Sequence, residues 1–322
     1  MAPDPLSEIL ALAGARSVIT GELRAGGRWS VRFATDAPVK LDAVVRGSCW
    51  LVADDDAPVR LATGDAVVLN GVGSMVLCSD PHLTPVPASD TISDTISDTF
   101  PGTAAGAATA RYGDGAEDDV LILGGHVALD PATAGIFTSA LPRVTRASAP
   151  GGEAEELRRL LDRIIDESVS GRPGAQFARD QHAQLLLLEA LRLGLRHEML
   201  THPGWLRLAA DPGLRPATAL IHSDPARAWG LAELAAAAGM SRSHFAHRFR
   251  QASGQPPLTY LTHWRIQLAR RELRRTDVTV AVLAQRLGYS SESSFSHAFT
   301  RVTGTSPSRY RRQVHAAWTA AS

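Results

Sequence analysis

The stretch LAQRLGYSSESSFSHAF, residues 283–299, has the pattern of two short helices joined by a tight turn. Its first run of apolar residues ends at Gly288, a residue type that readily takes the left-handed conformation at a helix end. One of the serines that follow can cap a second helix, and Phe295 and Phe299 share one face of that helix. The pattern predicts a helix-turn-helix, whose small polar residues leave room for its second helix to enter the major groove of DNA.

Nearly the same phrase, LAELAAAAGMSRSHFAHRF, stands at residues 231–249. The two copies share the spacing of the turn glycine, the paired phenylalanines and a later Gly, Pro and Tyr, and differ by one residue in the turn. One such pattern is not specific, because many helical proteins contain similar corners. Two copies in matching register predict a duplicated unit with two recognition helices, at 241–251 and 291–302.

Charge divides the chain although its formal net charge is zero. Residues 223–322 contain 14 arginines and 5 acidic residues, a net charge of +9, so the 19 basic and 28 acidic residues before them give −9. An arginine-rich C-terminal part joined to an acidic N-terminal part predicts that only the C-terminal part meets a polyanion.

A long helix is expected between the two copies, at residues 258–276, with one apolar side and one arginine-rich side. Its length of roughly 28 Å at 1.5 Å per residue is close to the ~34 Å between successive major-groove segments on one face of DNA. One chain can therefore place both recognition helices on the same duplex. Its basic side is formed by Arg265, Arg270, Arg271, Arg274 and Arg275.

These residues resemble the AraC/XylS family of transcription regulators over about 213–312. Three segments carry the resemblance: AGMSRSHFAHRFR (238–250), YLTHWRIQLARREL (260–273) and LAQRLGYSSESSFSHAFTRVTGTSPSRYR (283–311). The resemblance implies base-facing positions in both recognition helices, and phosphate-contacting positions in these helices and at Arg312. The base-facing positions are Arg242, Ser243, Ala246 and His247 in the first helix and Glu292, Ser293, Ser296 and His297 in the second. The phosphate contacts are Arg248, Arg250, Arg301 and Arg312.

Two of these positions depart from the family pattern. His247 and His297 stand where arginine is commoner, which leaves open the base that each would contact. Glu292 either accepts a hydrogen bond from a cytosine amino group or is a surface carboxylate near a helix N-terminus, and both interpretations stay open.

The N-terminal half has the pattern of an all-β module, a barrel or a jelly roll. Short strands are expected within 28–33, 41–52, 59–69, 74–78 and 120–129, and this half resembles the cupin-type sensor domains of the same family. Residues 79–119 contain the tandem repeat SDTISDTISDTF (89–100) and predict a mobile surface loop.

Two helices follow the β-rich half, one from 153 and one at 176–200. They either pack on the β-rich half or form a dimer interface. The fold class expected is α+β. The domains expected are a cupin-like sensor at 1–150, a helical linker or dimerisation region at 151–212, and a DNA-binding domain with two helix-turn-helix units at 213–316.

The β-rich half lacks the histidine pair of metal-binding cupins, so neither a metal nor another cofactor is expected. Cys49 and Cys78 are too few for a disulfide scaffold or a four-ligand zinc site. They are candidates for a reversible redox switch, or else they are inert, buried, small hydrophobic residues.

The sequence predicts a cytoplasmic, non-enzymatic, sequence-specific regulator of transcription. Its expected partners are promoter DNA, RNA polymerase, a small-molecule effector and a second copy of itself, and no membrane. One alternative is a cupin enzyme with an accessory DNA-binding domain, which would need a catalytic constellation. Others are a DNA-repair methyl acceptor, which would need a zinc-bound cysteine cluster, and a binder of DNA without base preference.

Overall fold

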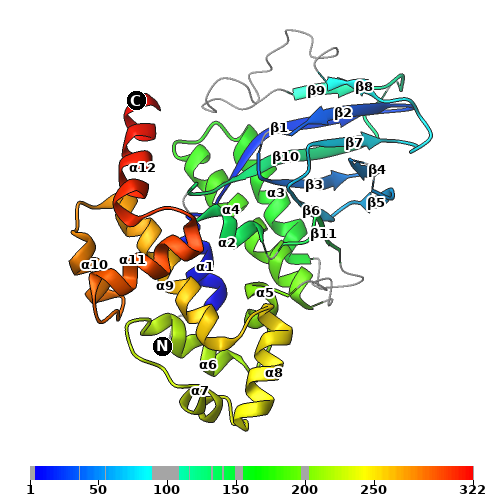
Figure 1. Cartoon of the computed structure of the whole chain (residues 1–322). Coiled ribbons are helices and arrows are strands. Elements are labelled where there is room, and N and C mark those ends of the chain that lie inside the picture. Colours follow the sequence, from blue (N-terminus) through cyan, green and yellow to red (C-terminus); the bar gives the residue numbers. More distant parts are fainter. Residues whose placement is uncertain are drawn as a thin grey trace. The chain divides into compact units, whose positions relative to one another are not determined.

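The computed structural model describes residues 4–35, 37–54, 56–88, 109–115, 117–131, 133–139, 141–148, 155–196 and 203–321. The chain forms two compact units. The β-rich unit consists of Arg16–Ala128 and Leu141–Thr201, and the helical unit consists of Met1–Ala15, Leu129–Ala140 and His202–Ser322 (Figure 1).

The strands of the β-rich unit form two sheets. A six-stranded sheet has the order β11-β6-β3-β10-β1-β9, and a five-stranded sheet has the order β5-β4-β7-β2-β8. The strands are β1 (Arg16–Ala25), β2 (Ser30–Ala34), β3 (Val39–Arg46), β4 (Ser48–Ala53), β5 (Val59–Ala62), β6 (Ala66–Asn70), β7 (Ser74–Cys78), β8 (Val86–Pro87), β9 (Thr109–Tyr112), β10 (Val120–Ala128) and β11 (Val144–Ala147).

Alternating burial along the strands produces one core between the two sheets. In β4 the residues at alternate positions, among them Leu51, are buried, and those between them are partly exposed. Leu51 of the five-stranded sheet belongs to the same buried cluster as Ile122 of the six-stranded sheet. The described strands thus confirm the predicted β-rich fold as two packed sheets, whereas one closed barrel is not formed among them.

The interpretation of residues 79–119 as a loop is wrong for β8 and β9, which are strands. β8 pairs in parallel with β2, and β9 pairs in parallel with β1. Tyr112 of β9 is buried and makes an edge contact with Phe33 at 6.4 Å between ring centroids. One buried ring among Gly, Ala and Asp residues was too weak a pattern to reveal a four-residue strand. The repeat at 89–100 lies outside the described residues.

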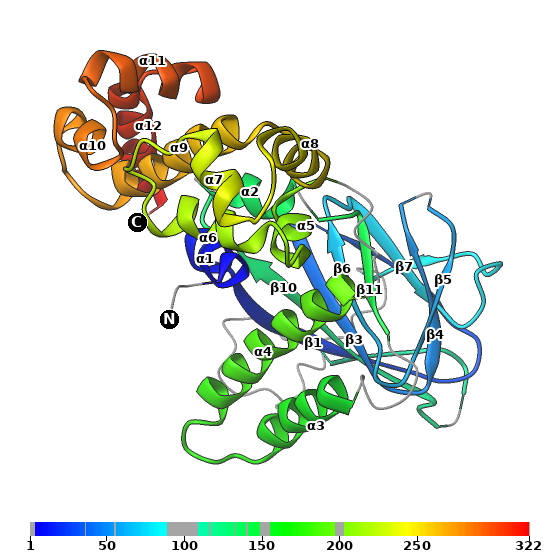
Figure 2. The same ribbon diagram turned by 90° about the horizontal axis from the view of Figure 1, so that it is seen from below.

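Helices α3 (Glu155–Val169) and α4 (Ala175–Arg196) pack against the six-stranded sheet (Figures 1 and 2). Leu157, Leu161 and Ile164 of α3 are buried, as their helical spacing predicts. Gln184 of α4 accepts a hydrogen bond from the backbone N–H of Ser17 in β1, at 2.9 Å. The pair therefore packs on the β-rich half, one of the two arrangements that the sequence left open.

The helical unit takes in two segments that the sequence analysis placed with the sensor domain. They are α1 (Pro5–Leu12) and α2 (Ala134–Thr138). The remaining helices are α5 (Trp205–Ala210), α6 (Arg215–Ser223), α7 (Leu231–Ala237), α8 (Arg242–Ser253), α9 (Pro257–Arg275), α10 (Val280–Arg286), α11 (Glu292–Thr303) and α12 (Pro307–Ala321).

A buried polar cluster attaches α1 to α6 and α9. Nδ1 of His222 lies 2.6 Å from Oε2 of Glu8, and Nε2 lies 2.8 Å from the Tyr260 hydroxyl. The imidazole stacks on Trp264 with ring centroids 3.9 Å apart. Burial lowers the pKa of His222, so the ring is neutral at neutral pH. The neutral ring shares a hydrogen bond with the Tyr260 hydroxyl through Nε2, and Nδ1 lies against the Glu8 carboxylate.

Arg265 of α9 fixes the loop at residues 225–227, which precedes α7. Its guanidinium donates to three successive backbone carbonyls of this loop at 2.6 to 3.4 Å, and lies over the ring of Tyr289, 5.5 Å from its centroid. Gly288 packs against the same loop. A Cβ at this position would lie 1.9 Å from the Ala226 carbonyl oxygen. The turn of the second helix-turn-helix thus lies against the entry to the first.

Gly288→Ala is expected to destabilise the protein more than Gly239→Ala. Both glycines have positive φ, of 77° and 64°, but a Cβ at Gly239 meets nothing within 4 Å. The Gly239 substitution should lower the free energy of unfolding by about 1–2 kcal/mol through backbone strain. The Gly288 substitution should cost about 1–3 kcal/mol more, because the Ala226 backbone must move. Denaturant unfolding of both variants measures the difference, and equal losses would contradict the close approach.

Candidate nucleic-acid interface

In both helix-turn-helix units, a serine caps the N-terminus of the second helix. In the first unit, Ser241 caps α8 and accepts a hydrogen bond from the N–H of His244 at 3.3 Å. In the second, Ser291 caps α11 and accepts from the N–H of Ser294 at 3.1 Å, while the Ser294 hydroxyl accepts from the N–H of Ser291. The predicted caps are therefore present, and they fix where each recognition helix begins.

Each recognition helix is held to the core by three aromatic rings. In the first unit, the rings of Phe245, Phe249 and Tyr260 follow one another with centroids 5.5 Å apart at each step. In the second unit, the equivalent rings lie 50 positions later in the chain, with steps of 5.7 and 5.5 Å. All four phenylalanines are fully buried. Since one face of each helix is used for this packing, the opposite face is available to solvent.

The structure brings the predicted base-facing residues to that free face at the N-terminal half of each helix. Equivalent base-facing positions of the two helices have the same exposure, and the last of the four positions in each helix is a histidine. Arg242, Ser243, His247, Glu292, Ser293 and His297 are exposed, and Ala246 and Ser296 are half-buried.

Arg248, one of the predicted phosphate contacts, is engaged by a carboxylate of the same unit. Its Nε and Nη2 donate to the two carboxylate oxygens of Asp211 at 2.9 and 2.7 Å. These hydrogen bonds raise the pKa of Arg248 above its ordinary value. Asp211 also accepts from the N–H groups of Gly213 and Leu214. Arg248 thus joins α8 to the turn before α6. The sequence could not predict this role, because it does not show which carboxylate lies beside Arg248 in the fold.

Most arginines of α9 also make contacts within the helical unit. Besides Arg265, Arg274 pairs with Asp130 at 2.7 Å, and Arg270 donates to the Tyr310 hydroxyl at 3.3 Å. Helical periodicity could not show that these arginines contact other segments of the chain, nor that Arg265 and Arg274, nine residues apart, lie on opposite sides of the helix. Among the described residues, Arg250, Arg301 and Arg312 are exposed and have no ion-pair partner. They are the phosphate-contacting candidates that remain.

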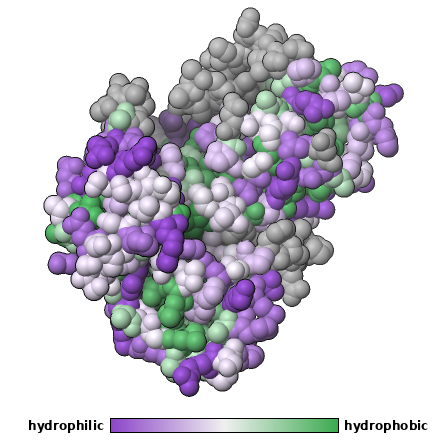
Figure 3. All heavy atoms as spheres, viewed as in Figure 1, coloured by the Kyte–Doolittle hydropathy of each residue, from purple (hydrophilic) through white to green (hydrophobic). Residues whose placement is uncertain are grey.

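The described residues contain no group of three or more His, Cys, Asp or Glu side chains placed to hold a metal ion. Within the same part of the chain, no helix has the length and apolar character needed to cross a bilayer. Figure 3 shows that the visible face of the helical unit combines hydrophilic side chains with a hydrophobic patch.

Comparison with known proteins agrees with this geometry. The family model described as a cupin matches residues 4–195, and the model described as a helix-turn-helix domain matches residues 234–313. Two proteins named as putative AraC-like transcription regulators, from Streptomyces lividans and Streptomyces antibioticus, are 39% and 38% identical to this chain over 311 residues. Each alignment covers 96% of this chain and 98% of the relative. This chain belongs to the AraC-like transcription regulators.

A third relative matches part of the regulator. The RCS-specific HTH-type transcriptional activator RclR of Escherichia coli (strain K12) is 35% identical over 181 residues, which are 55% of this chain and 63% of that protein. The predicted family and the predicted function as a DNA-binding transcription regulator are confirmed by these matches. The relatives are named as regulators and not as enzymes.

The two cysteines of the regulator face opposite sides of the five-stranded sheet. Cys78 is the direct antiparallel partner of Trp50, so these two side chains point to the same side. Cys49 precedes Trp50 in the same strand and points to the other side. Both cysteines are free and buried, and burial raises the pKa of the Cys49 thiol to about 12. This geometry argues against a disulfide between them.

Peroxide treatment of the native regulator is expected to give no Cys49–Cys78 peptide in mass spectrometry. Forming the bond would require β4 and β7 to separate, because the two thiols lie on opposite faces of the sheet that these strands share. Protein oxidised after unfolding in guanidinium chloride is the control, since its thiols can meet. A linked peptide at equal yield from native protein would show that the sheet opens under oxidation.

Arg250→Ala is expected to affect DNA binding, whereas Arg248→Ala is expected to affect stability. Arg250→Ala should weaken DNA binding and reduce the salt slope by about 1, with stability unchanged within about 0.5 kcal/mol. Arg248→Ala should lower the free energy of unfolding by about 1 kcal/mol, because Asp211 loses two hydrogen bonds at a partly exposed site. DNA titrations at several salt concentrations and denaturant unfolding measure these effects. A larger salt-slope change for Arg248→Ala would restore its assignment as a phosphate contact.

Proposed function

We propose that the regulator binds promoter DNA sequence-specifically, by placing the N-terminal halves of α8 and α11 in two successive major-groove segments. The observation that carries this proposal is the matching exposure of the two helices. Each has a serine cap, a buried phenylalanine pair on one side and four small or polar positions on the other. A free helix N-terminus with short side chains is the part that a major groove admits.

Base contacts and phosphate contacts come from different residues in this proposal. Arg242 can form paired hydrogen bonds with a guanine, and Glu292 can accept from a cytosine amino group. His247 and His297, at equivalent places in the two helices, each contact one base. Arg250, Arg301 and Arg312 neutralise phosphates, which fixes the position of the protein without selecting a sequence.

We propose that the β-rich unit binds an effector and thereby regulates DNA binding. The regulator would act in the cytoplasm, with RNA polymerase as its partner at the promoter. A homodimer through the α3–α4 pair is supported by apolar side chains that this pair leaves in solvent. Val169 is 67% exposed, Phe177 is 71% exposed and Leu185 is 47% exposed. Exposed apolar side chains on one pair of helices are the kind of surface that a dimer interface would cover.

Selection from genomic DNA fragments with the full-length protein, at near-physiological salt, tests the proposed function. One motif with two elements about ten base pairs apart is expected, because successive major-groove segments on one face are one helical turn apart. His247→Ala should relax the sequence preference in one element and His297→Ala in the other, by about 1–3 kcal/mol of discrimination per base pair.

Two outcomes would contradict this arrangement. Retention of DNA fragments without any shared motif would mean that binding is driven by charge alone. Loss of preference in the same element for both histidine variants would mean that the two helices do not contact separate sites.

A further inference from the structure

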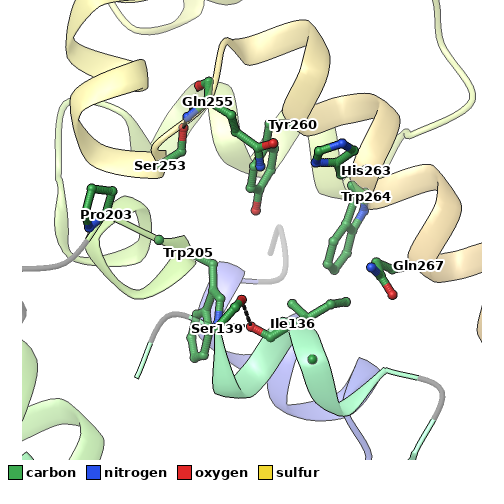
Figure 4. Close-up of a pocket in the computed structure, with 12 residues that line it drawn as sticks. Ile136, Ser139, Pro203, Trp205, Ser253, Gln255, Tyr260, His263, Trp264 and Gln267 are labelled. Carbon is green, nitrogen blue, oxygen red and sulfur yellow. Dashed lines mark hydrogen bonds between the residues drawn. The ribbon is translucent and has the colours of Figure 1, made fainter. Parts of the chain in front are cut away.

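A cavity of about 310 Å³ lies within the helical unit, where α2 and α5 face the end of α8 and the first turns of α9 (Figure 4). Tyr260 and Trp264 of α9 form one wall, and Ile136 of α2 and Trp205 of α5 form the wall across from it. The volume is at the lower end of the range found for small-molecule sites. All of the residues that line it belong to one compact unit.

The aromatic walls are held in place by hydrogen bonds outside the cavity space. The indole N–H of Trp205 donates to the Ile136 carbonyl at 2.7 Å, and the Tyr260 hydroxyl lies 2.8 Å from His222. Trp264 is stacked on the same histidine. Aromatic rings on two sides of the cavity favour a flat ligand that can lie between them. Because these rings are already fixed, little side-chain order has to be gained on binding.

The lining offers hydrogen-bond donors from the side-chain amide of Gln267. Gln267 uses its carbonyl oxygen to accept from Arg270, which leaves its amide N–H groups for another partner. A carbonyl group of a bound molecule could accept a hydrogen bond from this amide.

The lining carries no formal charge among the residues described for it. Its ionisable members are Tyr260, and His263, whose pKa is lowered by burial and by Arg301 nearby. Both side chains are neutral at neutral pH. A carboxylate or an ammonium group would therefore lose its hydration without gaining an opposite charge.

We propose that this cavity binds an uncharged, flat molecule whose carbonyl groups accept hydrogen bonds from the lining, and that its occupancy changes the affinity of the regulator for DNA. The second part rests on the proposed function, whereas the first does not. The site lies outside the β-rich unit, so it is distinct from an effector site between the sheets.

The cavity is directly connected to α8, the first of the two recognition helices. Ser253 ends α8, and Gln255 lies in the turn between α8 and α9; both line the cavity. The N–H of Gly204, at the start of α5, donates to the Ala252 carbonyl of α8 at 2.8 Å. A ligand between α2 and α9 would therefore stabilise one placement of α8, which carries the first set of base-facing residues.

Coumarin, an uncharged bicyclic lactone, is the probe for the site. The indole N–H resonances of the full-length protein, assigned by single Trp→Phe variants, report where it binds. Saturable shifts of the Trp264 and Trp205 resonances are expected, with Kd of about 1 mM or tighter. 1-Naphthoate, a charged molecule of similar size, should give at least tenfold weaker shifts. No coumarin shift, shifts confined to Trp29 and Trp50 of the β-rich unit, or equal binding of naphthoate would each overturn the proposal.

Gly135 of α2 offers a matched pair of variants. A Cβ at this lining position meets nothing within 4 Å. Gly135→Phe should fill the cavity and weaken coumarin binding at least tenfold, and Gly135→Ala should leave binding within about twofold. Thermal unfolding shows whether both variants fold. Unchanged coumarin binding by a folded Gly135→Phe protein would overturn the assignment of the site.

The regulatory part is measured with the selected DNA. Saturating coumarin should change the affinity for that DNA by about fivefold or more in the parent protein, and Gly135→Phe should abolish this change. Unchanged affinity at saturation would overturn the regulatory part alone. If the protein without coumarin selects no motif, the proposed function fails, and the indole shifts still decide whether the site exists.

Discussion

The DNA-facing surface depends on how each recognition helix is held from one side only. Two buried phenylalanines and a tyrosine ring on the next helix anchor it. Aromatic rings supply much buried area from few positions, so short helices of 12 residues can be fixed without using their outer faces. The serine caps complete this arrangement, because they satisfy backbone N–H groups that have no partner within the helix.

The long helix α9 does more than set the distance between the two copies. Its arginines hold the loop before α7, the Tyr310 hydroxyl and Asp130, so they stabilise the helical unit from within. The basic charge of the C-terminal part thus has two uses. Some of it holds helices together, and the exposed remainder, such as Arg250 and Arg301, is left for a polyanion.

Sequence reasoning was most reliable where spacing alone determines the structure. The Phe pairs, the turn glycines and the capping serines follow from local periodicity, and so does the buried side of α3. It failed where the outcome depends on residues far apart in the chain. The pairing of Arg248 with Asp211 and the buried contact of Glu8 with His222 join segments 37 and 214 positions apart, and no local pattern indicates them. The opposite orientation of Cys49 and Cys78 depended on strand register, which the sequence did not specify.

The chain order of the helical unit has a consequence for biosynthesis. The residues that complete this unit come from the beginning, the middle and the end of the chain. At ~5–20 residues per second, Glu8 is synthesised roughly 10–40 s before its partner His222. During this time Leu6, Ile9 and Leu12 of α1 lack the surface that buries them in the finished protein. The β-rich unit can acquire its core on the ribosome, whereas the DNA-binding unit can close only after the C-terminal helices have been released. A nascent chain would therefore be unable to bind DNA through both recognition helices before these helices have folded.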